Sequence, residues 1–168
     1  MRQRGLSMIE ILVTLTIVAF GLLGLLGLQA RALSFQKDSF DRKAAAELVA
    51  QLAERMRANH LGFLAGSYAT TFEAATATPG AVTTCAAPCT SAQVAARDLD
   101  EWRIELRRRI PTGGAYIAWD PANPSWVTVS IAWAEPQAAG NDAVCDALVG
   151  GGAVIPANYR CYQTRVFP

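Results

Sequence analysis

The sequence has few of the residues on which common catalytic sites depend. Histidine occurs once, at His60, which falls at an expected helix end without an evident nucleophile or second metal ligand. The sequence contains no phosphate-binding glycine loop, no G-x-S-x-G and no HExxH motif. We therefore expect a surface or capping role for His60, and we expect no enzymatic activity, no metal site and no cofactor.

A strong charge of either sign is also missing. Fifteen basic and fourteen acidic residues give a formal net charge of +1, and they are spread along the chain rather than blocked. The one basic run, Arg107 to Arg109, falls at an expected helix C-terminus, where the macrodipole favours cations. The sequence thus gives no indication of a directly bound nucleic acid.

Charged residues are absent from the apolar run Ile11 to Leu28. About eighteen helical residues at 1.5 Å each reach about 27 Å, which is close to the hydrocarbon thickness of a bilayer. Arg2 and Arg4 precede this run, so the positive-inside tendency places the N-terminus in the cytoplasm and the chain after Arg31 outside. The sequence predicts a single membrane span.

One carboxylate, Glu10, opens the apolar run, where an ionised group costs about 2.5–3.5 kcal/mol. A secretory signal peptide is one interpretation, because Ala30 and Ala32 offer an A-x-A pattern. The apolar run is nevertheless longer than the usual h-region. A plain membrane anchor is another, although it explains Glu10 only as a side chain that reaches toward the headgroups.

The stretch RGLSMIEILVTL resembles the class III prepilin signal of type IV pilins and type II secretion pseudopilins, with Gly5 before the scissile bond and Glu10 at the fifth mature position. The resemblance implies that prepilin peptidase cuts between Gly5 and Leu6 and methylates the new amine of Leu6. A glycine suits that position because its missing Cβ lets an extended backbone enter a narrow cleft. Residues 1–5 would then be the leader peptide.

The same resemblance gives Glu10 a role in assembly. The carboxylate would neutralise the N-terminal amine of an adjacent subunit, since a paired buried charge is tolerated where an unpaired one is strongly destabilising. Pseudopilins at the extreme tip of a filament tend to lack this glutamate, so Glu10 implies a neighbour above this subunit. Residues 6–30 would form the transmembrane and filament-core helix, and residues 31–168 the periplasmic head.

A continuous helix is predicted from about Leu6 to Arg57, because no proline occurs before Pro79. Its second half is amphipathic, with apolar residues at four-residue intervals that should pack on the head. This stripe consists of Phe40, Ala44, Leu48, Leu52 and Met56, widened by Val49. Asn59 and Gly62 indicate where the helix ends. Its second half should therefore form the central helix of the head.

The rest of the chain indicates an α+β fold. Residues 66–90 have loop composition, and a helix capped by Ser91 then runs to Pro111. The segments AYIAW, WVTVSIAW and YRCYQTRVF are expected strands of a small antiparallel sheet packed on the long helix. The expected core faces are Val94, Leu99, Trp102, Leu106 and Ile110 of the helix, and Val127, Val129, Ile131 and Trp133 of the central strand.

Four cysteines follow the span, and they allow three disulfide pairings. We prefer the neighbour pairing, Cys85 with Cys89 and Cys145 with Cys161. The second bond would close a loop of about fifteen residues, which the chain-entropy model values at around 3 kcal/mol. A four-sulfur zinc site is the alternative, but an oxidising compartment favours disulfides.

Four looser segments narrow the resemblance to PilV-type minor pilins, the type IV pilus modification proteins: GLLGLLGLQARAL, AAELVAQLAERMRAN, DLDEWRIELRRRIPTGG and VTVSIAWAE. The resemblance implies a minor pilin that primes or joins the fibre near its tip, with motility, adhesion and DNA uptake downstream. Implied partners are prepilin peptidase, other minor and major pilins, the pilus assembly platform and the inner membrane. Alternatives are a type II secretion pseudopilin and a Sec-cleaved soluble periplasmic binding protein.

Overall fold

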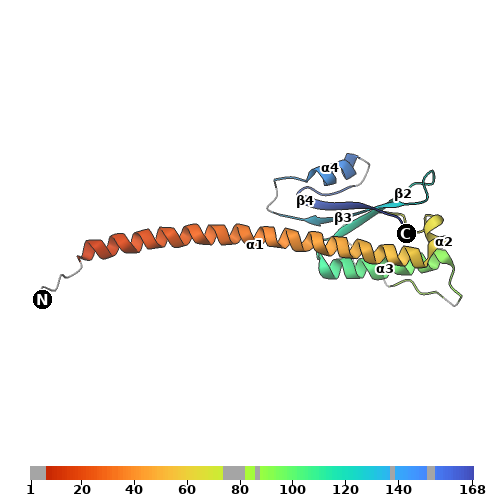
Figure 1. Cartoon of the computed structure of the whole chain (residues 1–168), viewed down its shortest axis with the longest axis horizontal. Coiled ribbons are helices and arrows are strands. Elements are labelled where there is room, and N and C mark those ends of the chain that lie inside the picture. The colour runs from red at the N-terminus through yellow and green to blue at the C-terminus, as the bar shows by residue number, and fades with distance from the viewer. Residues whose placement is uncertain (1–6, 74–81, 86–87, 137–138, 151–153) are drawn as a thin grey trace. The chain divides into compact units, whose positions relative to one another are not determined.

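The computed structural model describes residues 7–73, 82–85, 88–136, 139–150 and 154–168 (Figure 1). The chain divides into two compact units, Met1–Phe40 and Asp41–Pro168. Helix α1, Met8–Ala58, contributes residues to both units. The second unit is called the head below.

The first unit consists of the N-terminal part of α1. The carbonyl of Ser7 accepts the backbone N–H groups of Glu10 at 3.0 Å and Ile11 at 3.3 Å, which begins the helix. The hydroxyls of Thr14 and Thr16 donate to carbonyls of the preceding turn, so these polar groups are satisfied within the apolar segment. By length and composition α1 could cross a membrane, and the apolar side chains of its N-terminal part are exposed.

The head contains a four-stranded antiparallel sheet in the order β1-β2-β3-β4. Its strands are β1 Thr70–Glu73, β2 Gly114–Trp119, β3 Val127–Ala134 and β4 Tyr159–Val166. Between Thr70 and Glu73 the β1–β2 register shifts, as at a β-bulge. The last three strands are those that the alternating sequence patterns predict.

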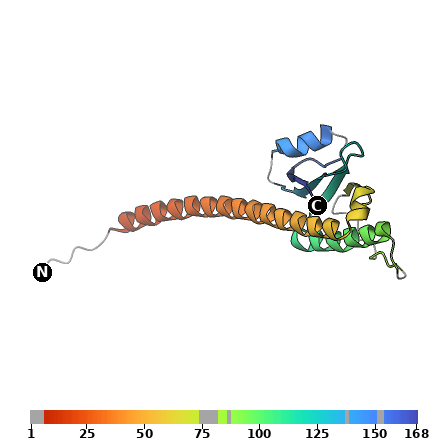
Figure 2. The ribbon, with the colours of Figure 1, turned by 45° about the vertical axis from the view of Figure 1, so that its right-hand side comes forward.

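One face of the sheet forms the main core with α1 and with α3, Ser91–Arg109 (Figure 2). Alternate residues of a strand point to the same face, and Val127, Val129, Ile131 and Trp133 are all buried there. They pack with residues from both helices, including Leu48, Leu52, Met56, Trp102 and Leu106. The predicted α+β fold is therefore confirmed.

The opposite face of the sheet is partly covered by α4, Ala143–Gly150 (Figures 1 and 2). A second, smaller core forms there around Cys145, Leu148 and Ile155, with Ala132 and Cys161 from the sheet. The sequence patterns did not predict α4. Both faces of the sheet are therefore packed over part of its area.

Several local predictions need correction. Phe40 is 71% exposed, because the buried stripe of α1 begins only at Ala45. The N-cap of α3 is Thr90 rather than Ser91, since Thr90 and Gln93 form a reciprocal capping box. Val94 is half-buried, and the neighbouring Ala95 takes its expected place in the core.

The region expected to be a loop also contains a strand. Strand β1 lies within residues 66–90, where the composition indicated only irregular chain. The predicted stop of α1 is correct, but a short helix α2, His60–Leu64, follows directly after Asn59.

Candidate assembly segment and polar network of the head

Glu10 is exposed near the start of α1. Its carboxylate has no hydrogen bond or ion pair with any residue that the structure describes. The next residues of the helix are apolar and also exposed, including Ile11 at 44% and Leu12 at 62%. The arrangement places a carboxylate that has no partner among the described residues at the end of a long exposed apolar surface.

The predicted cleavage and methylation site lies outside the described residues. Gly5 and Leu6 both precede Ser7, the first residue with a described position. Their roles therefore remain predictions based on the sequence motif.

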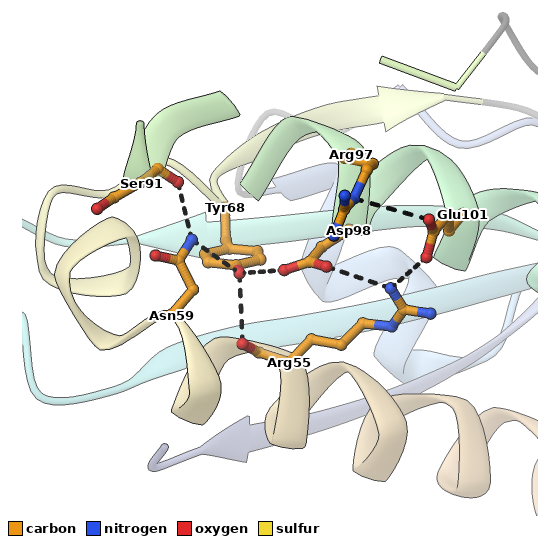
Figure 3. A network of polar contacts seen from close by, with 7 residues as sticks. All are labelled: Arg55, Asn59, Tyr68, Ser91, Arg97, Asp98 and Glu101. Carbon is orange, nitrogen blue, oxygen red and sulfur yellow. Dashed lines mark hydrogen bonds and ion pairs between the residues drawn. The ribbon is translucent and has the colours of Figure 1, made fainter. Parts of the chain in front are cut away.

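Within the head, a polar network joins α1 to α3 (Figure 3). One nitrogen of Arg55, Nη1, donates to Glu101 Oε2 at 2.8 Å and to Asp98 Oδ1 at 3.2 Å. Asp98 is buried, with 8% of its surface exposed, so its charge depends on these partners. The hydrogen bond to Glu101 is the main reason that the pKa of Arg55 is raised.

Tyr68 supplies a second donor to the buried carboxylate (Figure 3). Its hydroxyl donates to Asp98 Oδ2 at 2.6 Å, and only 1% of the residue is exposed. Burial raises the pKa of the Tyr68 phenol well above its ordinary value, and the neighbouring Asp98 raises it further. Tyr68 is therefore held in its neutral, donating form.

Asn59 completes the network at the end of α1. Its side-chain amide donates to the Tyr68 hydroxyl at 3.2 Å and to the backbone carbonyl of Ser91 at 2.8 Å. The second bond ties the chain that leaves α1 to the first turn of α3. The network as a whole fixes α3 against α1.

Both disulfides of the preferred pairing are present. Cys85 and Cys89 are bonded with 5.6 Å between their Cα atoms, and Cys145 and Cys161 with 5.2 Å. All four sulfurs are therefore used, which removes the basis for the alternative zinc site. Asp142 lies beside the second bond, but its oxygens accept the backbone N–H groups of Cys145 at 2.9 Å and Cys161 at 3.1 Å.

The remaining sites considered from the sequence have ordinary surroundings. His60 is exposed in α2, with its ring 6.0 Å from that of Phe63. In the basic run of α3, Arg109 pairs with Glu105 and with Glu47 of α1, each at 2.8 Å. The Glu105 hydrogen bond is the first cause of the raised pKa of Arg109.

Sequence reasoning missed the polar network entirely. Asp98 lies 43 residues from Arg55 along the chain, and no motif connects them. A signal existed in the position of Asp98, which falls on the apolar face of α3 next to Leu99 and four residues before Trp102. A carboxylate at a core position requires a buried partner.

Comparison with protein-family models gives two matches. The model for the prokaryotic N-terminal methylation motif matches residues 1–26, and the model described as Type IV pilin Tt1218 matches residues 27–100. The two matches adjoin and together extend from the basic leader to the middle of α3. Searches of curated proteins and of solved structures found no significant match.

Proposed function

This chain is a type IV pilin, since the methylation motif and the pilin model together match residues 1–100, and we propose that it is a minor subunit of a type IV pilus. In this role it is a structural protein rather than an enzyme. It is cut by prepilin peptidase between Gly5 and Leu6 and methylated at Leu6. It then joins or primes the fibre near its tip, with the assembly platform and the other pilins as partners.

The observation that carries this proposal is the exposed apolar segment of α1 headed by Glu10. The segment extends over Ile11–Leu28 without a charge, and Glu10 has no partner among the described residues. A membrane before assembly and a bundle of equivalent helices afterwards would each cover the apolar surface. The amine created at Leu6 of a neighbouring subunit would neutralise Glu10.

The proposed topology places the N-terminus in the cytoplasm and the head in the periplasm. Arg2 and Arg4 before the span support it through the positive-inside tendency. The two disulfides of the head support it as well, because such bonds persist in oxidising compartments.

N-terminal mass spectrometry of the mature protein tests the processing step. We expect a chain that begins at N-methylated Leu6. A chain that begins at Leu33 would identify a cleaved secretory signal peptide instead and would overturn the proposal.

A type II secretion pseudopilin is the second candidate, because the same leader and Glu10 support it equally. The two are separated by deletion of the gene. Loss of surface fibres with normal export of enzymes supports the pilus role, whereas normal fibres with lost export support the secretion role.

A further inference from the structure

Arg165 lies on a part of the sheet that α4 leaves uncovered. Ala118, Thr128 and Arg165 are paired in one row across β2, β3 and β4. Because strand residues alternate between faces, this row lies opposite the buried face that carries Val127. Helix α4 covers the same face near Ala132, several residues along β3 from Thr128.

The guanidinium of Arg165 is held in place by an aromatic ring. Its central carbon lies 4.5 Å from the ring centroid of Trp126, which immediately precedes β3. Stacking on an indole fixes the plane of the guanidinium while its N–H donors stay available at the edge. Phe167 follows directly after β4 and is 63% exposed. An exposed apolar side chain therefore lies two residues after Arg165 in the sequence.

Arg165 also differs from the other exposed arginines of the head in its charge environment. In the part of the chain that the structure describes, no carboxylate lies within 4.0 Å of Arg165. Each other exposed arginine has an aspartate or glutamate within that distance, namely Arg42, Arg57, Arg97, Arg108 and Arg109. Arg165 is thus a pre-oriented cation whose charge is not neutralised within the head.

We propose that Arg165, Trp126 and Phe167 form a docking surface for a partner protein segment that presents an aspartate or glutamate beside an apolar side chain. A guanidinium with a fixed plane binds a carboxylate through two parallel hydrogen bonds. The stacked Trp126 ring would exclude water from one side of the pair, and interface centres are rich in Trp, Phe and Arg. This inference does not depend on whether the protein serves a pilus or a secretion filament.

Site-specific photo-cross-linking in the producing cells tests the proposal with the full chain. Gln163 is exposed and lies two residues from Arg165 on the same face, so a benzophenone amino acid at that position would report on this surface. We expect a cross-link to a partner segment that contains an acidic residue. The yield should fall about tenfold in Arg165→Gln, as for loss of a charge-assisted bond.

Arg108→Gln is the matched control, because its side chain is 82% exposed and its loss removes the same charge. The yield should be unchanged in this variant, and it should fall again when the mapped acidic residue of the partner is changed to its amide. No protein adduct, an adduct to lipid alone, a partner segment without an acidic residue, or equal yield in Arg165→Gln would each overturn the proposal.

Discussion

The Tyr68 hydroxyl is the shortest contact to the buried Asp98 carboxylate, at 2.6 Å. Removing this donor leaves the carboxylate with Arg55, at 3.2 Å, as its one side-chain partner among the described residues. Loss of the Tyr68 hydroxyl should therefore lower the stability of the head by more than one hydrogen bond, because the buried Asp98 carboxylate is left incompletely satisfied.

We predict that Tyr68→Phe lowers the free energy of unfolding of the head by about 1–3 kcal/mol near pH 8. The ring keeps its packing, so the loss measures the hydrogen bonds of the hydroxyl, which include the one to Asp98 and the one from Asn59. Chemical denaturation of the full chain in detergent is the measurement. Tyr162→Phe is the control, because that half-buried ring packs on the same core and its hydroxyl has no hydrogen bond within the described chain.

The destabilisation should depend on pH, because the pKa of Tyr68 is raised in the folded state. Below about pH 10 the phenol is neutral in both states, and its contribution is complete. Above that pH the unfolded chain ionises first, so the contribution is lost as pH rises toward the folded pKa. The difference between Tyr68→Phe and the unmodified protein should therefore shrink above pH 10, and a constant difference would contradict the assignment.

At the scale of elements, Trp102 links α3 to α1 by a hydrogen bond as well as by packing. Its indole N–H donates to the backbone carbonyl of Leu48 at 2.8 Å inside the core. Trp133 of β3 is equally buried, but its indole N–H has no partner within the described chain. The two tryptophans therefore form a matched pair.

We predict that Trp102→Phe costs about 1–2 kcal/mol more unfolding free energy than Trp133→Phe. Both changes leave a similar cavity, but only the first leaves a buried carbonyl without its side-chain donor, while the second removes an unsatisfied donor. Denaturant titration of both variants is the measurement. Equal losses would show that the Trp102 bond contributes nothing to the joint between α1 and α3.

Elements with a long periodic pattern could be predicted from the sequence, and short elements could not. The stripe from Leu48 to Met56 and the alternation in β3 identify their elements because many residues repeat one period. Strand β1 has four residues and a shifted register, and α4 has eight. Their formation depends on contacts with β2 and with Cys161, which lie far along the chain.

Of the candidate functional residues, too, only those that belong to a local sequence motif could be predicted. The proposed assembly role of Glu10 is predicted by a local motif, because the leader, the glycine and the glutamate all lie within ten residues. The network of Arg55, Tyr68 and Asp98 was not, because its members meet only once α3 packs on α1. A carboxylate on an apolar helix face indicates that a buried partner exists but not which residue it is.

For the whole molecule, the central prediction concerns Glu10→Ala. The change should leave the melting temperature of the head unchanged, because Glu10 has no partner among the described residues. It should abolish incorporation into fibres, since a buried ion pair that loses one member costs about 3–5 kcal/mol. The measurement is the ratio of this subunit in sheared fibres to that in the membrane fraction.

Glu54→Ala is the control for Glu10→Ala, because Glu54 is an exposed carboxylate of the same helix. Its incorporation should equal that of the unmodified protein. If Glu10→Ala also incorporates normally, the proposed role of Glu10 is wrong, even if the mass of the mature N-terminus shows correct cleavage.

The disulfides determine how the molecule would respond to mechanical load. Both bonds join residues after α1, so no disulfide joins α1 to the rest of the head, and beyond the backbone at Ala58 the helix is held there by non-covalent contacts. A tensile force applied through the N-terminal segment would act on the packing of Leu48, Leu52 and Met56, on the Trp102 hydrogen bond and on the Arg55 ion pairs. The first rupture under tension would then be the withdrawal of α1, with both cross-linked loops still closed.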